Sequence, residues 1–428
     1  MLPKNADSET AAEIDAYINA LAEMNRFSGA VLVARQGHVV LSKGYGMANH
    51  EHDVPNTPQT VFRIGSLSKQ FTAMAIMLLH EAGHLRVEDT VAQYLPDYPH
   101  GAKITIHHLL THSSGLPREA GLPTAPMVLS TEQVVELVKA KPLEFEPGTH
   151  QLYSNAGYQL LAYLIEKASG KPYAAFLAKN IFQPLGMSNT GQDSQHLVLK
   201  HRASGYAWAD GQIIKVEFEN IQNSYGSGNL YSTVEDLYRW DQALYTGKPV
   251  SEMAQDAMFE NHYGVGKHQV LEHTGIAAAG RRNGFNAYLA RFVDDRVTII
   301  FLTNFDEVPL VQMMNDLPAI LFGADYEMPK SIFRKAVAIN PEIYDHFTGE
   351  YQLAIDSSQT FYVVKEDDRL FLVDEGEKKE LFPESETDFF AAPDSEDTFV
   401  FVRNEKDQVT QMTITMLGGM DLVAKKII

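Results

Sequence analysis

Two apolar strand pairs that lie far apart in the sequence constrain the fold most. Residues 28–34 and 38–42 alternate as a β-hairpin, and residues 287–293 and 297–302 form a second pair close to a helix at 310–322. Most of the sequence between the two pairs has helix and loop patterns. Strands at both ends predict one antiparallel sheet flanked by helices, and the middle predicts a separate helical lobe. The expected fold class is therefore α+β.

The sequence pattern changes between residues 329 and 341. Downstream segments are short, rich in β-forming residues and separated by acidic turns, at 361–364, 370–373, 398–402 and 412–416. Short strands at such regular spacing predict a small all-β domain, a sandwich or a barrel. We therefore expect two domains, residues 1–335 and 336–428.

Composition excludes several kinds of partner and chemistry. The formal charge of −20 over 428 residues disfavours nucleic acid and polybasic membrane binding. There is no cysteine, so disulfides and thiolate nucleophiles are excluded, although the compartment is not determined. Residues 1–7 lack the apolar stretch of a signal peptide, and no apolar run predicts a transmembrane anchor.

One motif places a nucleophile beside an amine. Ser66 and Lys69 form the Ser-x-x-Lys of this sequence, at the start of a helix predicted over 71–81. The i, i+3 spacing puts both side chains on one helical face. A desolvated lysine can accept the serine proton, and the helix N-terminus favours developing negative charge. Taken alone, the motif is more often a helix cap followed by an exposed lysine.

Two further motifs carry polar groups suited to the same reaction. Tyr153 and Asn155 precede a helix at 157–168, where a phenol can move a proton and an amide can hold a substrate carbonyl. The segment His273-Thr274-Gly275 precedes the late strand pair, and a glycine there permits close approach of a ligand. Each motif alone is typical of an ordinary turn or helix start.

In this order, the three motifs resemble those of the serine β-lactamase and penicillin-binding-protein superfamily. The sequence looks most similar to the branch of class C β-lactamases, D-amino-acid peptidases and related esterases. Further phrases fit the resemblance, at 62–66, 109–117 and 230–237. It covers residues 10 to 325 and implies a β-lactamase/DD-peptidase-like domain, followed by a lipocalin-like C-terminal barrel.

The resemblance also implies roles for residues. Ser66 would be the acylated nucleophile, Lys69 and Tyr153 the acid–base pair, and Asn155 a substrate contact. His273, Thr274 and Gly275 would form the third motif, with the N–H of Ile276 facing that of Ser66.

The chain departs from the family pattern in two places. Residues 276–282 lack the usual second glycine directly after the third motif, which leaves the oxyanion donor open. Arg281 and Arg282 in this stretch are either solvated loop residues or groups that bind a substrate carboxylate. Asn229 replaces a small residue and is expected to shape the pocket.

A zinc-protease pattern also occurs, as His80-Glu81-Ala82-Gly83-His84. That chemistry needs both histidines on one face of a continuous helix, and Gly83 is placed to end this helix. Zinc peptidase activity is therefore a remote alternative, and we expect neither a metal nor an organic cofactor.

The leading hypothesis is a serine hydrolase that cleaves a carboxylester, a D-aminoacyl peptide or a β-lactam through an acyl-enzyme on Ser66. The alternative is a penicillin-binding or sensor-like protein, which would be acylated by its ligand without efficient turnover. Either reading implies a small-molecule or short peptide substrate. The natural substrate, the oligomeric state and the role of the C-terminal domain stay open.

Overall fold

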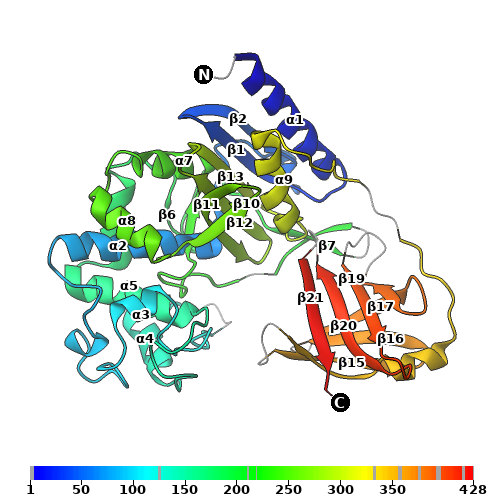
Figure 1. Cartoon of the computed structure of the whole chain (residues 1–428). Helices are drawn as coiled ribbons and strands as arrows, with labels where there is room; N and C mark the ends of the chain where they lie inside the picture. The colour runs from blue at the N-terminus through cyan, green and yellow to red at the C-terminus, as the bar shows by residue number, and fades with distance from the viewer. Residues whose placement is uncertain are drawn as a thin grey trace. The chain divides into compact units, whose positions relative to one another are not determined.

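The structure is a computed structural model that describes residues 4–123, 127–209, 212–217, 219–330, 334–354, 359–374, 377–391, 397–416 and 420–427. The chain packs as two compact units, Met1–Val308 and Pro309–Ile428, and each is described by itself (Figure 1). The domain limit expected at residue 335 stays a prediction. Within the ranges above, no helix combines the length and apolarity that crossing a bilayer requires.

A six-stranded antiparallel sheet lies at the centre of the first unit, in the order β10-β11-β12-β13-β1-β2. Leu32 of β1 pairs with Ile300 of β13, so the two distant hairpins meet in the middle of the sheet. This confirms the predicted sheet. Its strands are β1 (Gly29–Arg35), β2 (His38–Tyr45), β10 (Gly266–Val270), β11 (His273–Arg282), β12 (Phe285–Phe292) and β13 (Val297–Thr303).

Alternation along the central strands divides the sheet into two buried faces. Ala30, Leu32 and Ala34 of β1 belong to the large apolar core shared with the helical lobe. The other face is covered by α1 (Lys4–Glu23), which contacts β2 and buries an apolar stripe of Ile14, Tyr17, Ile18 and Leu21. Strands β12 and β13 are buried along their whole length.

The helical lobe is built around α2 (Lys69–Glu81), most of whose residues are buried. The helix begins directly after a 3-10 turn, η1 (Gly65–Ser68), and Gly83 follows its end with a φ of +73°. Gly83 therefore directs the chain away from the helix, as predicted, and His84 lies beyond the helical face that carries His80.

Further helices complete the first unit. Helix α7 contacts β1 and β13. Its N-cap is Thr233, whose side chain accepts the N–H of Asp236. The helices are α3 (Ile106–Leu110), α4 (Thr131–Lys139), α5 (Asn155–Ser169), α6 (Tyr173–Leu177), α7 (Val234–Ala243) and α8 (Glu252–Glu260), with shorter turns η2 (Val91–Gln93) and η3 (Ala178–Phe182).

Short strands join the lobe to the sheet. The small sheet β5-β9-β6 leads into η1, because Arg63 of β5 pairs with Tyr231 of β9 just before Gly65. Its strands are β5 (Phe62–Arg63), β9 (Leu230–Ser232) and β6 (Gly191–Gln192). Two other short pairs are β3 (Met47–Asn49) with β4 (Val54–Pro55), and β7 (Tyr206–Ala209) with β8 (Gln212–Lys215).

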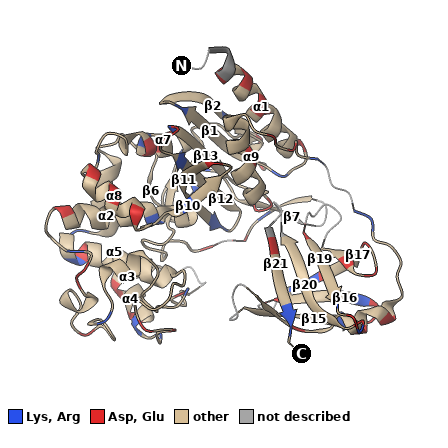
Figure 2. Ribbon diagram, in the orientation of Figure 1, with Lys and Arg blue, Asp and Glu red and all other residues tan. Residues whose placement is uncertain are grey.

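The second unit contains α9 (Leu310–Phe322), η4 (Pro341–His346) and a closed eight-stranded barrel, which confirms the predicted all-β domain. Aromatic rings fill the barrel core, where Phe347 stacks on Phe401 at 4.3 Å. Acidic and basic residues are interspersed on both units (Figure 2). The barrel strands are β14 (Gly349–Leu353), β15 (Thr360–Glu366), β16 (Arg369–Asp374), β17 (Glu377–Pro383), β18 (Asp388–Phe390), β19 (Thr398–Arg403), β20 (Val409–Met416) and β21 (Met420–Lys426).

Candidate active site

Ser66 lies in η1, where the turn faces strand β11. Its neighbours Gly65, Leu67 and Ser68 are buried, whereas Ser66 itself is half-buried. Ser66 is therefore the residue of this turn whose side chain is partly accessible to solvent, while its neighbours are buried. Its place at the start of α2 puts it at the positive end of the helix dipole.

Lys69 begins α2 and points back toward Ser66. Its Nζ lies 3.2 Å from Ser66 Oγ, 2.7 Å from Asn155 Oδ1 and 2.7 Å from the carbonyl oxygen of Ser227. Burial lowers the pKa of this ammonium well below its usual value, and the charge of Arg282 adds to the effect. Lys69 is therefore suited to act as a neutral amine.

The contacts of Lys69 indicate which way its lone pair points. A neutral amine has two N–H groups and one lone pair, and the oxygens of Asn155 and Ser227 can only accept hydrogen bonds. Both N–H groups are used by these two acceptors, so the lone pair is left for the Ser66 hydroxyl. This geometry prepares Lys69 to take the serine proton directly.

Tyr153 completes the group around the nucleophile. Its hydroxyl donates to Ser66 Oγ at 2.7 Å. Burial raises the pKa of Tyr153, although the hydrogen bond to Ser66 and the charges of Arg118 and Arg282 oppose that rise. The raised pKa of Tyr153 favours a protonated phenol, and the lowered pKa of Lys69 favours a neutral amine.

The segment of Tyr153 is held by its role as a helix start. Ser154 is the N-cap of α5 and accepts the N–H of Gly157 at 2.9 Å, while its own hydroxyl donates to the carbonyl of Pro117 at 2.7 Å. Asn155 is consequently the first helical residue, and its amide reaches Lys69. The helix start thus places the Tyr153 side chain against Ser66 and the Asn155 side chain against Lys69.

His112 packs against Tyr153 and contacts the backbone of the next residue. Its Nδ1 accepts the N–H of Ser154 at 3.0 Å, and its ring lies 4.6 Å from that of Tyr153. Burial, with a contribution from Lys69, lowers the pKa of His112 to about 3. The ring is therefore neutral at ordinary pH and acts as a fixed packing partner. In the sequence, residues 109–117 support the family resemblance but predict no role for His112.

The structure does not bring the predicted third motif to Ser66. His273 pairs with Val270 at the end of the β10–β11 hairpin, and its Nδ1 lies 2.8 Å from Asp295 Oδ2. Gly275 and Ile276 pair with β10 residues, and Thr274 lies between them and His273. A strand rises by about 3.3 Å per residue, and Ile276 comes several residues before the part of β11 that lies against η1, so Ile276 lies well away from Ser66. The letters His-Thr-Gly match, but their position on β11 does not.

The part of β11 that lies against η1 is formed by Gly280 and Arg281. A Cβ on Gly280 would overlap the carbonyl oxygen of Ile64, and one on Gly65 would lie 2.7 Å from the carbonyl oxygen of Arg281. These two glycines let the backbones of η1 and β11 approach closely. A glycine five residues beyond Gly275 was visible in the sequence, but no spacing rule assigned it to the site.

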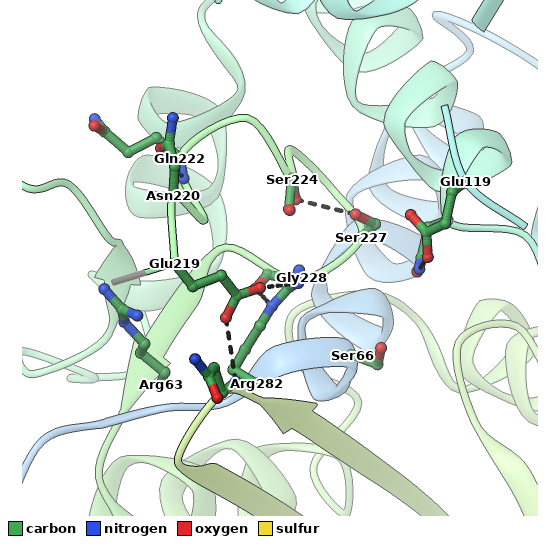
Figure 3. A network of polar contacts seen from close by, with 12 residues as sticks. Arg63, Ser66, Glu119, Glu219, Asn220, Gln222, Ser224, Ser227, Gly228 and Arg282 are labelled. Atoms are coloured by element: carbon green, nitrogen blue, oxygen red, sulfur yellow. Dashed lines mark hydrogen bonds and ion pairs between the residues drawn. The ribbon is translucent and has the colours of Figure 1, made fainter. Parts of the chain in front are cut away.

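Arg282 ends the strand beside this contact. Its Nε donates to the carbonyl of Gly228 at 3.1 Å, and its Nη1 pairs with Glu219 Oε1 at 2.9 Å. Figure 3 shows the guanidinium between Glu219 and Gly228, with Ser66 nearby. Arg281 instead has an exposed side chain, 3.9 Å from Asp306. Arg282 therefore brings a positive charge close to Lys69.

A cavity of about 340 Å³ is lined by Glu219 and, among others, by Arg63, Asp193, Arg202 and Asn283. Ser66 is not among its lining residues. Asp193 forms ion pairs with both Arg63 and Arg202, so the charged groups lining this cavity bind one another. The buried Asn229 donates to the carbonyl of Gln222 on the loop that carries Glu219.

No cluster of three or more His, Asp or Glu suited to a metal ion occurs among the described residues. The groups gathered at Ser66 are an amine, a phenol, an amide and backbone N–H groups, which serve proton transfer and anion stabilisation.

Comparisons with known proteins show the family to which the chain belongs. Residues 14–320 match the family model described as Beta-lactamase. A penicillin-binding protein of Bacillus subtilis (strain 168) is 33% identical over 413 residues, covering 88% of this chain and 90% of the relative. The teichoic acid D-alanine hydrolase of Staphylococcus aureus (strain NCTC 8325 / PS 47) is 26% identical over 321 residues, covering 71% of this chain and 77% of its own length.

A solved structure matches both units. The octameric penicillin-binding protein homologue from Pyrococcus abyssi has a TM-score of 0.65 and 25% identity, covering 97% of this chain and 99% of that one. The family model spans the strands and helices that hold Ser66, Lys69 and Tyr153. The chain therefore belongs to the beta-lactamase family, within the superfamily of serine β-lactamases and penicillin-binding proteins.

Proposed function

We propose that this protein is a serine hydrolase that cleaves an ester or amide through an acyl-enzyme on Ser66. The observation that carries the proposal is the double contact of Ser66 Oγ, with Tyr153 at 2.7 Å and Lys69 at 3.2 Å. One neighbour accepts a proton and the other can donate one. The relatives named as hydrolases support the reaction class.

Acylation follows from this geometry. Ser66 Oγ attacks the carbonyl carbon while its proton passes to Lys69 Nζ. The tetrahedral oxyanion forms where the N–H groups of Ser66 and Arg281 are proposed to meet it, since Gly65 and Gly280 hold η1 against β11. One such donor is worth about 2.7–4 kcal/mol. The C–X bond then breaks, and the leaving group X takes the Tyr153 proton.

Deacylation reverses the roles. The Tyr153 phenolate takes a proton from water, whose oxygen attacks the ester carbon. Ser66 leaves and recovers its proton from the Lys69 ammonium. The sum is hydrolysis of the acyl donor, with Ser66, Lys69 and Tyr153 each back in the starting protonation state. The ammonium lies 4.7 Å from the Tyr153 ring centroid, which stabilises the phenolate between the two steps.

Hydrolysis of a substrate panel tests the proposal. The panel contains p-nitrophenyl esters, D- and L-aminoacyl amides and a cephalosporin, and each is tested on the wild type and on Ser66→Ala. Turnover of at least one class that Ser66→Ala lacks supports the proposal. Turnover that Ser66→Ala retains, or no turnover of any class, contradicts it.

A further inference from the structure

Thr72 lies one helical turn after Lys69 on α2, and its side chain is buried. Ser66, Lys69 and Thr72 follow one another at intervals of three residues, so their side chains lie along one face of the helix start. The proton transfers described above use the first two and leave the Thr72 hydroxyl without a part. This hydroxyl nevertheless makes contacts that lead back to Lys69.

The Thr72 hydroxyl lies between a carbonyl and a phenol. Its Oγ1 is 2.7 Å from the carbonyl oxygen of Gly226 and 2.8 Å from the hydroxyl of Tyr173, whereas the carbonyl oxygen of Ser68 is 3.5 Å away. A threonine hydroxyl has one proton, and a carbonyl oxygen can only accept. Thr72 therefore donates to Gly226, and Tyr173 donates to Thr72. Burial raises the pKa of Tyr173, so the phenol keeps the proton that this arrangement requires.

Gly226 and Ser227 have successive carbonyl groups, and both accept hydrogen bonds from side chains of α2. The first accepts from Thr72 and the second from Lys69, each at 2.7 Å. Gly226 has a φ of +69°, and a Cβ there would lie 2.3 Å from the carbonyl oxygen of Tyr158 on α5. The backbone at Gly226 is therefore held between α2 and α5, and the position of the Ser227 carbonyl depends on it.

We propose that Thr72 is a positioning residue for the acylation step. Its hydroxyl fixes the Gly226 carbonyl, and the next carbonyl along the chain, that of Ser227, is thereby held against an N–H of Lys69. With this acceptor in place the lone pair of the amine stays directed at Ser66, and without it the amine can rotate about its Cε–Nζ bond. This inference rests on the proposed function, because it explains how the proposed base keeps its direction.

Removal of the Thr72 hydroxyl tests the inference. Thr72→Val keeps the shape of the side chain but loses the donor, whereas Thr72→Ser keeps the donor. We expect kcat/KM with a p-nitrophenyl ester, per folded molecule, to fall by roughly 10- to 100-fold in Thr72→Val, as it does when a reacting group is misplaced. In Thr72→Ser it should stay close to that of the wild type. Because p-nitrophenolate needs little help in leaving, this rate reports proton transfer to Lys69.

Thr303→Val is the matched control. Thr303 ends β13 and is buried, and its hydroxyl also donates to one carbonyl, that of Phe305 at 3.1 Å, and accepts one N–H, that of Asn286 at 3.2 Å. The two threonine-to-valine changes thus remove the same kind of buried hydroxyl. Thr303→Val should lose stability but keep the kcat/KM of the wild type.

A double variant separates stability from positioning. Thr72→Val leaves the buried Tyr173 hydroxyl without this acceptor, which lowers stability, and Tyr173→Phe removes that hydroxyl. The variant that combines both changes should therefore regain part of the lost Tm but none of the lost kcat/KM. It also carries the test if Thr72→Val alone does not fold.

The outcomes separate the inference from the proposed function. The inference is overturned by wild-type kcat/KM in Thr72→Val or in the double variant, by a loss that Thr72→Ser shares, by an equal loss in Thr303→Val, or by recovery of kcat/KM together with Tm. In each of these cases Ser66-dependent turnover by the wild type still supports the proposed function. Absence of all Ser66-dependent turnover overturns both.

Discussion

Gly280 of strand β11 lies directly against the carbonyl of Ile64, two residues before the nucleophile. A side chain at this position would push the strand away from η1. The contact sets the distance between the backbone of β11 and that of Ser66, and the proposed oxyanion site depends on it.

Gly280→Ala is therefore expected to lower kcat/KM by about 100-fold or more, the loss typical of one oxyanion donor. Steady-state kinetics with a p-nitrophenyl ester measure this. Gly266→Ala on β10 is the matched control, because its Cβ would meet nothing closer than 3.9 Å. If Gly280→Ala stays folded with wild-type kcat/KM, the assignment of β11 to the oxyanion site is wrong.

Tyr153→Phe should reduce turnover in a way that depends on the leaving group. The phenol protonates the leaving group during acylation, so kcat/KM, which reports acylation, should fall roughly 10²–10⁴-fold for a poor leaving group such as an alkylamine and much less for p-nitrophenolate. Parallel kinetics with an amide and its p-nitrophenyl ester measure the difference. Tyr163→Phe, within α5, should change neither rate. Equal losses for both substrates would exclude Tyr153 as the leaving-group acid.

Lys69→Met should change how the thermal stability of the protein depends on pH. The pKa of Lys69 is lowered in the folded state, so between that value and the unfolded value of about 10.4 the unfolded chain binds more protons. The wild type therefore gains stability as pH rises through this window, and Lys69→Met lacks this gain. The Tm of the variant minus that of the wild type should fall from pH 7 to pH 10, and an unchanged difference would contradict a neutral buried Lys69.

Arg282 should control the pH at which the enzyme becomes active. Its charge lowers the pKa of Lys69, so Arg282→Met should raise that pKa and move the acidic limb of the pH–rate profile to higher pH. Arg281→Gln is the comparison, since it removes a neighbouring charge but keeps the backbone N–H. Equal shifts in both variants would mean that net charge, not the placement of Arg282, is responsible.

Local patterns predicted the parts of the site that lie on single elements. Ser66 and Lys69 share a helix start, and Tyr153 with Asn155 open α5 behind the cap Ser154. The motif that failed, at His273, depended on how far along β11 the strand meets η1. Such register is set by pairing with β10 and β12, which a tripeptide does not encode.

Other features depend on contacts between distant segments. The Ser227 carbonyl, Glu119 and Arg282 reach the site from loops and a strand end, where no periodicity marks them. The fold was more predictable, because the apolar hairpins indicated the sheet. Several barrel strands, such as β14 and β21, were missed because their polar alternation is short and weak.

The most direct test of the account is the site of the covalent intermediate. Rapid acid quench after mixing with a p-nitrophenyl ester, followed by peptide mass spectrometry, locates the acyl group. Ser68 lies two residues away, but its buried hydroxyl accepts the N–H of Leu230, so fragmentation must distinguish the two serines. The account predicts an adduct on Ser66 that decays as product forms. Product release with the acyl group on another residue, or with no covalent adduct, would contradict it.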